Sequence, residues 1–249
     1  MIVRKSASEI EIMREAGRVS ARALRLVGEA VAVGVSTLEL DEIAENAIRA
    51  DGGAPAFKGY HGFPKTLCTS INNQVVHGIP SESVTLRDGD ILSVDVGAVV
   101  DGYYGDTART FAVGSVSDEA ARLLVATKSA LDAGIEQARA GHHLFDISAA
   151  VQAVAEEAGF GVVREYVGHG ICRNMHEDPN VPNYGPAGKG PRLEVGMVLA
   201  IEPMVNAGGA AVDALPDGWT VVTRDGRLSA HFEHTVAITH DGPVVLTVE

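Results

Sequence analysis

The sequence has few cysteines and few aromatic residues, and each shortage excludes a class of protein. Cys68 and Cys172 are the only cysteines among 249 residues, too few for the disulfide framework of a secreted domain. Aromatic residues make up 5% of the chain, which disfavours a platform for stacking nucleic-acid bases. Lysine and arginine form no cluster, and a net charge of −13 repels a phosphate backbone. We therefore expect no direct DNA binding.

Long apolar runs are also missing. No segment reaches the roughly 18 apolar residues of a membrane-spanning helix, and the charged opening lacks the apolar stretch of a signal peptide. We therefore expect no membrane association and a cytoplasmic location. Apolar residues nevertheless make up 46% of the chain, which is long enough to bury one substantial core. This predicts a single domain over residues 1–249.

Helical periodicity begins near the N-terminus. Ser8 and Glu11 have the spacing of a capping box, and a stripe of small or apolar residues then recurs at helical spacing. The stripe consists of Ile10, Met13, Gly17, Ser20, Leu24, Val27 and Val31. A second helix is predicted over 37–50, and a second pair of helices over 118–139 and 145–158. Strand-like segments follow each pair.

The two helix pairs belong to an internal repeat. Segment 86–95, LRDGDILSVD, matches segment 193–202, LEVGMVLAIE, at an offset of 107 residues. Two glycine pairs keep the same offset without a gap, Gly34 with Gly141 and Gly52 with Gly159. Chance recurrence of glycine-containing strands is the alternative. We favour a duplication, with halves of about 1–115 and 116–249 facing each other around a central cleft.

Two aspartates lie on a predicted hairpin. Asp95 ends the apolar segment ILSVD, and Asp101 with Gly102 suits a two-residue type I′ turn. This turn places Asp106 opposite Gly97, so that Asp95 and Asp106 lie diagonally on one face. Buried carboxylates repel each other unless a cation compensates, which favours a site for two metals. The alternative is that both aspartates cap turns at strand ends.

The second half supplies two further acids. At the repeat offset Asp95 corresponds to Glu202, and the next acid on a strand is Glu233. That assignment requires an insertion in the second hairpin of about 20 residues. The segment 203–225 is rich in glycine, proline and alanine, contains Trp219, and fits this insertion.

Histidines complete the set of candidate ligands. The segment GHGICRNMHEDP contains His169 and His176. A lone histidine is often structural, but His169 lies between two glycines that allow close backbone approach. An oxygen-rich set with one imidazole suits Mn²⁺, Fe²⁺ or Co²⁺ and tolerates Zn²⁺. Two such metals activate water for amide hydrolysis, which is the reaction that the residues favour.

These motifs resemble those of methionine aminopeptidases of the bacterial type I form, over essentially the whole chain. The segments that carry the resemblance are CTSINNQVVHGIP, DVGAVVDGYYGDTART, GHGICRNMHEDP, AIEPM and LSAHFEHT. The resemblance implies an α+β pita-bread fold, in which two pseudo-twofold halves place antiparallel sheets around a central dimetal cleft. It also implies one catalytic domain that removes the initiator methionine of nascent polypeptides when the second residue is small, with metal-activated water as nucleophile.

The resemblance further assigns roles to residues. The ligands of two divalent metals (Co, Mn, Fe or Zn) would be Asp95, Asp106, His169, Glu202 and Glu233. Within this set Asp106 and Glu233 would bridge both metals, and Glu202 would also be the general base. Two histidines, His77 and His176, would contact the scissile amide and stabilise the oxyanion. The methionine pocket would comprise Tyr60, His61, Phe63, Cys68, Met175 and Trp219, alongside both histidines.

Several assignments have alternatives. Asn72 and Ser229 match positions that hold a monovalent cation, Na⁺ or K⁺, in some relatives. His77 is otherwise a turn residue, and 60–63 otherwise a surface loop. Four residues replace the family's usual ones, namely Phe63 (usually tyrosine), Cys172 (glycine), Met175 (phenylalanine) and His231 (glutamine). His231 is either a second donor beside Glu233 or a tolerated polar substitution.

Three rival functions remain. A proline-specific aminopeptidase or prolidase shares this metal set but usually has an extra N-terminal domain, for which the sequence leaves no room. Similarly, the 33-residue interval from His169 to Glu202 has no room for the insertion of type II methionine aminopeptidases. A pseudoenzyme of this fold would bind a peptide or a partner protein without hydrolysis, and the intact set of ligands argues against it. A cysteine hydrolase using Cys172 would need His169 as both ligand and base.

As partners we expect nascent chains and, transiently, the ribosome, and we expect a monomer.

Overall fold

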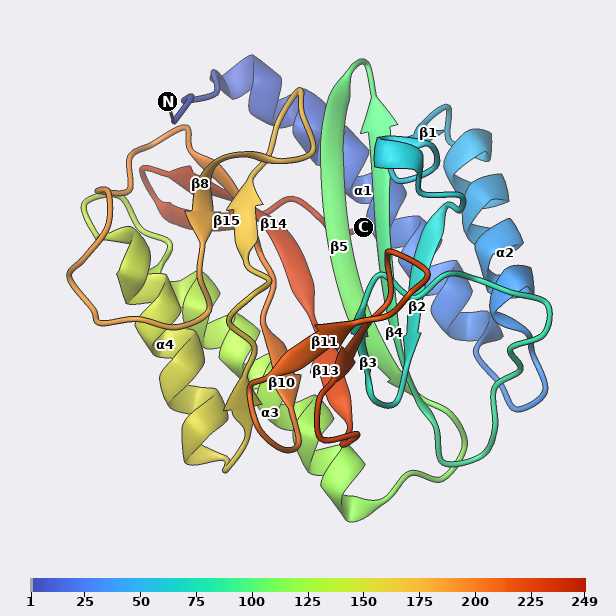
Figure 1. Cartoon of the computed structure of the whole chain (residues 1–249). Helices are drawn as coiled ribbons and strands as arrows, with labels where there is room; N and C mark the ends of the chain where they lie inside the picture. The colour runs from blue at the N-terminus through green and yellow to red at the C-terminus, as the bar shows by residue number, and fades with distance from the viewer. Residues whose placement is uncertain (1) are drawn as a thin grey trace.

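The structure, a computed structural model, describes residues 2–249 (Figure 1). Within these residues the helices are α1 (Ala7–Ala30), α2 (Thr37–Ala50), α3 (Asp118–Gln137) and α4 (Leu144–Glu157), with a short 3₁₀ helix η1 (Tyr60–Gly62). The strands are β1 (Ala54–Pro55), β2 (Leu67–Ile71), β3 (Gln74–Val76), β4 (Ile91–Val100), β5 (Tyr103–Ala112), β6 (Gly161–Val162), β7 (Gly168–Gly170), β8 (Glu177–Val181), β9 (Val198–Ile201), β10 (Met204–Asn206), β11 (Val212–Ala214), β12 (Val221–Thr223), β13 (Ser229–His231), β14 (Glu233–Thr239) and β15 (Gly242–Val245).

The predicted helix pairs are confirmed, but the start of the first helix was predicted wrongly. Its capping box is formed by Ser6 and Glu9 instead of Ser8 and Glu11. The Ser6 backbone is extended, and its N–H donates to the Glu9 carboxylate at 2.9 Å. Ser8 already lies inside α1. Both pairs have the same spacing, so only the backbone geometry distinguishes them.

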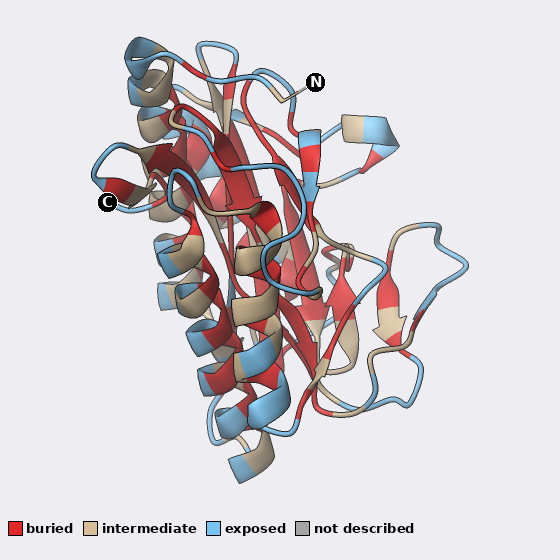
Figure 2. Ribbon diagram, turned by 90° about the vertical axis from the view of Figure 1, so that its left-hand side faces the viewer, coloured by how far each residue is buried: buried red, intermediate tan, exposed pale blue. Residues whose placement is uncertain are grey.

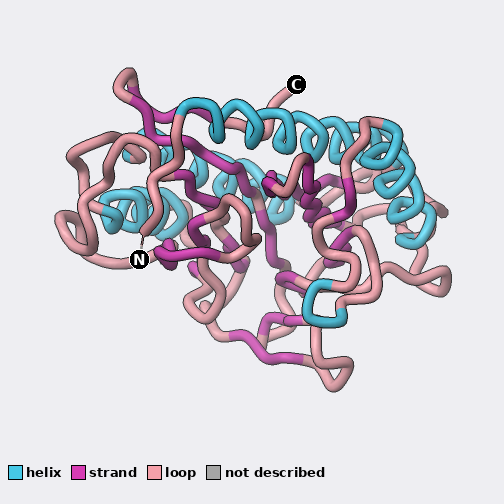
Figure 3. The backbone as a smooth tube through the Cα atoms, turned by 90° about the horizontal axis from the view of Figure 1, so that it is seen from above, coloured by secondary structure: helices cyan, strands magenta, loops and turns pink. Residues whose placement is uncertain are grey.

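The fold has a layer of helices against a layer of antiparallel strands. The main sheet runs β1-β4-β5-β14-β9-β7-β8, with β2 paired to β4 and β15 to β14. Figures 2 and 3 show all four helices on one face of this sheet, whereas the short strands and loops extend from the other face. Within residues 2–249, no helix combines the length and the apolar character needed to cross a membrane.

The internal repeat is visible in the backbone. Helices α2 and α4 begin and end at equivalent positions, 107 residues apart. The same offset relates two isolated bridges, Ser36 with Thr85 and His143 with Arg192. Gly34 and Gly141 share a left-handed backbone, with φ values of 92° and 91°. The two halves therefore have matching frames, as the pita-bread fold requires.

Two glycines allow α1 to pack directly on β5 and on the segment after β15. A Cβ atom at Gly105 would lie 2.5 Å from the backbone nitrogen of Gly17. A Cβ atom at Gly17 would lie 2.4 Å from the carbonyl oxygen of Leu246. In both cases the neighbour is backbone and has no flexible end that can move aside. Close packing therefore requires a glycine at Gly17, one of the small residues in the predicted α1 stripe.

Gly105→Ala is expected to destabilise the protein, because the added methyl group pushes α1 away from the sheet that carries Asp106. Overpacking of this kind costs about 1–3 kcal/mol, measured as a lower urea midpoint. Gly209→Ala is the matched control, since its Cβ atom would have no neighbour nearer than 3.9 Å. Equal midpoints for the two variants would contradict the close packing of α1 on β5.

Candidate active site

The β4–β5 hairpin has the predicted register. Asp101 and Gly102 form its turn with φ values of 50° and 77°, as a type I′ turn requires. Asp106 lies opposite Gly97, and Asp95 lies opposite Ala108. Because side chains alternate along strands, the two carboxylates share one face of the sheet. Local turn chemistry therefore determines the spacing of the first pair of acids.

Neighbouring strands add the remaining candidate ligands. On β14, Glu233 pairs with Ala108 of β5 and lies beside the hairpin acids. On β7, His169 pairs with Ala200 of β9. Glu202 directly follows β9, and its Oε1 lies 3.4 Å from His169 Nε2. Four residues on β4, β5, β14 and β7, and one at the end of β9, thus converge on one point across five adjacent strands of one sheet.

Burial makes this cluster electrostatically costly without a cation. One ligand atom each of Asp106, His169 and Glu233 lies within 4.8 Å of the others. Three carboxylate oxygens are buried and have no hydrogen-bond partner within residues 2–249, namely Asp95 Oδ1, Asp106 Oδ1 and Glu233 Oε1. Unpaired buried charges of this kind cost several kcal/mol. The cluster therefore fits a divalent metal, which pairs with such oxygens.

The pKa values of the acids also indicate that the cluster requires a cation. Burial, followed by repulsion from neighbouring carboxylates, raises the pKa of Asp95, Glu202 and Glu233 well above the usual range. Burial raises the pKa of Asp106 to about 7. A cation between the acids would reverse these shifts, because it stabilises the charged forms.

His169 is neutral and oriented by its own strand. Burial lowers its pKa to about 4, with a smaller contribution from His176. Its Nδ1 lies 3.0 Å from the carbonyl oxygen of Gly170, which only accepts, so Nδ1 carries the proton and donates. Nε2 is therefore bare and faces Glu202. This is the form of imidazole that binds a metal ion.

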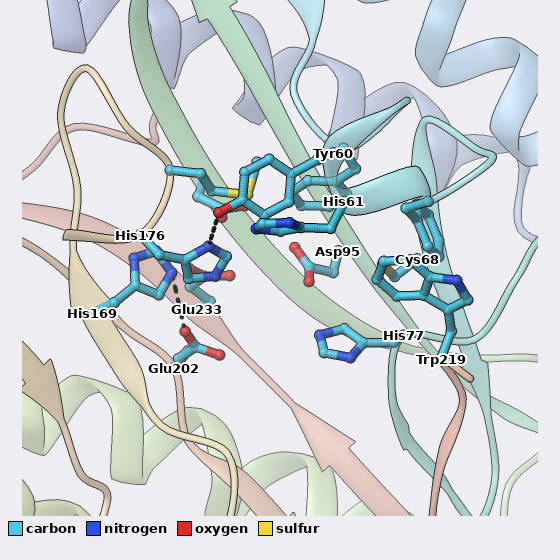
Figure 4. Close-up of a pocket in the computed structure, with 14 residues that line it drawn as sticks. Tyr60, His61, Cys68, His77, Asp95, His169, His176, Glu202, Trp219 and Glu233 are labelled. Atoms are coloured by element: carbon cyan, nitrogen blue, oxygen red, sulfur yellow. Dashed lines mark hydrogen bonds and ion pairs between the residues drawn. The ribbon is translucent and has the colours of Figure 1, made fainter. Parts of the chain in front are cut away.

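The cluster opens into a cavity of about 380 Å³. All thirteen residues predicted for metal binding, catalysis or the methionine pocket line it: Tyr60, His61, Phe63, Cys68, His77, Asp95, Asp106, His169, Met175, His176, Glu202, Trp219 and Glu233. Figure 4 shows His169, Glu202 and Glu233 on one side of the cavity and Cys68 and Trp219 on the other. A polar end and an apolar end therefore share one space.

The apolar end contains a residue that sequence reasoning missed. Phe57 lines the cavity and packs in one cluster with Phe63, Cys68 and Met175. Phe63 also meets Trp219 edge to face, with ring centroids 5.0 Å apart. Three aromatic residues at 57, 60 and 63 in a chain that is 5% aromatic were the available signal. The segment 60–63 is thus part of the cavity wall rather than a separate surface loop.

The insertion, residues 203–225, reaches the cavity because its strands pair with a strand of the first half. Its strands β11 and β12 form a small sheet with β3 of the first half. This pairing brings Trp219, in the β11–β12 turn, to the cavity. His77 directly follows β3 and is half-buried, with a left-handed φ of 61°. Burial lowers its pKa to about 4. It therefore lies in the cavity wall and is no exposed turn residue.

Other predicted positions lie outside the cavity. The backbone N–H of Ser229 donates to the Asn72 carbonyl at 2.8 Å, and the Asn72 side chain bonds to Asp90 and Ile91. The structure thus brings Asn72 and Ser229 together, away from the candidate metal site. Cys172 packs in a different apolar cluster and does not line the cavity, which disfavours a cysteine nucleophile.

His231 lies beside a different acid from the one expected. Its Nε2 is 3.6 Å from Glu202 Oε2, and only 1% of the residue is exposed. The expectation of a place beside Glu233 assumed continuous alternation along one strand. Instead β13 ends at His231 and β14 begins at Glu233, with Phe232 between them. The break turns the imidazole towards Glu202.

Comparison with known proteins agrees with this geometry. The chain belongs to metallopeptidase family M24, whose sequence profile matches residues 11–240. It is 53% identical to a methionine aminopeptidase of Clostridium acetobutylicum, over 100% of this chain and 99% of the relative. It is 52% identical to methionine aminopeptidase 1 of Bacillus subtilis, over 99% of each.

Solved structures give the same grouping. A methionine aminopeptidase of Thermotoga maritima superposes with a TM-score of 0.99 at 44% identity, over 100% of both chains. A prolidase of Pyrococcus furiosus superposes with a TM-score of 0.79 at 24% identity, over 99% of this chain and 66% of its own. The prolidase likeness shows the shared fold alone.

Proposed function

We propose that this protein is a methionine aminopeptidase that removes the initiator methionine from nascent polypeptides with a small second residue. The observation that carries the proposal is the cluster of buried, unpaired carboxylate oxygens at one end of a cavity whose other end is apolar. Full-length relatives at about half identity bear the same name, which supports the reaction.

The proposed cofactors are two divalent metal ions. Asp95, Asp106, His169, Glu202 and Glu233 would hold them, with Asp106 and Glu233 shared between both. Four carboxylates balance two divalent charges, and the donor set suits Mn²⁺, Fe²⁺ or Co²⁺ and tolerates Zn²⁺. Such metals, when bound, supply an activated water for attack on the amide.

The chain's own groups would move protons and orient the amide. Glu202 lies at the polar end of the cavity, where a general base for the amide must lie. His77 and His176 line the same cavity, and burial lowers the pKa of each, which keeps the rings neutral near pH 7. Their N–H groups would donate to the scissile amide and to its carbonyl oxygen as charge develops there.

The apolar end would bind the methionine side chain. Methionine is unbranched and polarizable, and it fills an irregular pocket lined by aromatic rings and sulfur better than a branched side chain does. Phe63, which is 3% exposed, packs in one cluster with Cys68 and meets Trp219 edge to face. It is therefore the residue on which we expect methionine binding to depend most.

Phe63→Ala is expected to lower kcat/KM for Met-Gly-Met by about tenfold to a hundredfold, because it removes apolar contact with the substrate side chain. Steady-state kinetics on the metal-loaded protein measures this. Phe145→Ala is the control, since Phe145 packs beside Gly185 and Gly190, outside the cavity. An equal loss in both variants would assign the effect to general destabilisation.

Several further properties are proposed with this function. The chain would act as one catalytic domain over residues 1–249, as a monomer in the cytoplasm, in transient association with the ribosome. A monovalent cation, Na⁺ or K⁺, would bind near Asn72 and Ser229. Its support is the carbonyl of Asn72, which the left-handed backbone at φ 55° turns towards Ser229.

A panel of peptides tests the reaction. Met-Gly-Met, Leu-Gly-Gly and an Xaa-Pro peptide would be incubated with the protein and each of Mn²⁺, Fe²⁺, Co²⁺ and Zn²⁺. The proposal predicts release of methionine from Met-Gly-Met with at least one metal, and little cleavage of the other two. Preferred cleavage of the Xaa-Pro peptide would instead identify a prolidase. No cleavage with any metal would favour a pseudoenzyme.

A further inference from the structure

A hydrogen bond joins two residues of the cavity wall that lie far apart in sequence. The Tyr60 hydroxyl lies 2.8 Å from His176 Nδ1, and the ring centroids are 5.5 Å apart (Figure 4). Tyr60 belongs to η1, whereas His176 directly precedes β8. Both residues line the cavity and are partly open to solvent. The bond therefore bridges the cavity where it meets the surface.

The turn around η1 holds the backbone from which the Tyr60 side chain extends. The Tyr60 N–H donates to the Phe57 carbonyl, and the Phe63 N–H donates to the Tyr60 carbonyl, both at 2.9 Å. The Gly59 N–H donates to the Phe63 carbonyl at 2.8 Å. Phe63 is buried against Trp219 and anchors the turn. The backbone that carries Tyr60 is thus held in place before a substrate enters.

The direction of the bond follows from acid strength. A phenol with a pKa of about 10 is a much stronger acid than the N–H of neutral imidazole, and the bare ring nitrogen is the stronger base. Tyr60 therefore donates and His176 Nδ1 accepts. The proton of neutral His176 must then lie on Nε2, the nitrogen left for a substrate. Within residues 2–249 the His176 ring has no other hydrogen bond.

The neighbouring histidine has the opposite arrangement. His169 donates from Nδ1 to the Gly170 carbonyl, so its bare nitrogen is Nε2. The two rings lie close together, with centroids 4.3 Å apart. One bond to a backbone carbonyl and one to a phenol thus give adjacent imidazoles different capacities. The first can bind a metal, and the second can donate a hydrogen bond.

We propose that Tyr60 is a positioning residue that holds His176 in the Nε2–H form, aimed at the carbonyl oxygen of the scissile amide. The inference rests on the proposed role of His176 in methionine release. It assigns Tyr60 a polar task in addition to its place in the apolar wall. Loss of the hydroxyl leaves that wall intact but frees the imidazole ring and its proton.

Kinetics separates this task from simple packing. Tyr60→Phe should lower kcat for Met-Gly-Met about tenfold, the effect of one lost hydrogen bond, with KM changed by less than about threefold. Tyr184→Phe is the control, because that half-buried tyrosine stacks on Arg164 and does not line the cavity. In a His176→Ala background, Tyr60→Phe should have no further effect, since the two residues act as a pair. An equal loss in that background would overturn the proposal.

NMR spectroscopy tests the tautomer without reference to activity. Long-range ¹⁵N–¹H correlation on the Zn²⁺-loaded 26.0 kDa protein would report the two nitrogens of His176, assigned by their absence in His176→Ala. The proposal predicts a bare Nδ1 in the wild type and a shift towards a mixed tautomer in Tyr60→Phe. A protonated Nδ1 in the wild type, or identical spectra for the two proteins, would overturn it. Lack of Met-Gly-Met cleavage would contradict the proposed function but would leave this result standing.

Discussion

Asp106→Ala is expected to lower the rate of Met-Gly-Met cleavage at least about 10³-fold, equivalent to about 4 kcal/mol of transition-state stabilisation. Asp106 is one of three residues whose ligand atoms lie within 4.8 Å of one another, and it lies on the central hairpin. Its removal takes away a proposed bridge between two metals and leaves Glu233 without the cation that compensates its charge. Metal content and peptide cleavage would be measured on the same sample.

Asp101→Asn provides the matched control for this loss. Asp101 is the turn residue of the same hairpin, five positions away, and asparagine tolerates its φ of 50°. We expect wild-type metal content and activity. If Asp106→Ala kept its metal and its rate, the assignment of the cluster as the metal centre would be wrong. If both variants lost activity equally, damage to the hairpin would be the cause.

The second large effect concerns stability without metal. The pKa of Asp106 in the folded protein is about 7, against about 3.9 for an unfolded aspartate. Between these values the folded state binds more protons than the unfolded state, so the free energy of unfolding falls as pH rises. Asp95, Glu202 and Glu233 have raised pKa values and act in the same direction. Buried histidines with lowered pKa values act in the opposite direction, but mostly below pH 7. Metal-free protein should therefore be more stable at pH 7 than at pH 8.

Metal should reverse this loss at pH 8. A ligand at 1,000 times its Kd stabilises a folded protein by about 4 kcal/mol, and a divalent cation also replaces the protons on the acids. Urea unfolding at pH 7 and pH 8, with EDTA or with Mn²⁺, measures both effects. Asp106→Asn in EDTA should show a weaker dependence on pH than the wild type. Stability that rises from pH 7 to pH 8 without metal would contradict the proposed burial of the four acids.

Much of the site follows from local rules in the sequence. The Asp101–Gly102 turn and the alternation of strand residues are enough to place Asp95 and Asp106 on one face. The repeat then locates Glu202, because α2 and α4 show that the offset is kept without a gap. These features depend on neighbours along the chain or on a duplicated frame. Tertiary contacts do not alter them.

Other features depend on contacts that a single sequence does not reveal. The insertion pairs with β3, more than 100 residues earlier, and this pairing brings Trp219 to the cavity. Phe232 interrupts the strand between His231 and Glu233, so counting by twos gave the wrong neighbour. The two capping boxes at the start of α1 have equal spacing, and the choice of Ser6 follows from its extended backbone.

Titration of the metal-free protein with a divalent cation tests most directly whether methionine release depends on the proposed metal centre. EDTA-treated protein would receive Mn²⁺ or Co²⁺ in steps, with Met-Gly-Met cleavage and bound metal measured at each step. We expect no methionine release before metal is added, and then a rise in rate that saturates at no more than two bound ions per chain. Full activity in the metal-free protein would contradict this expectation.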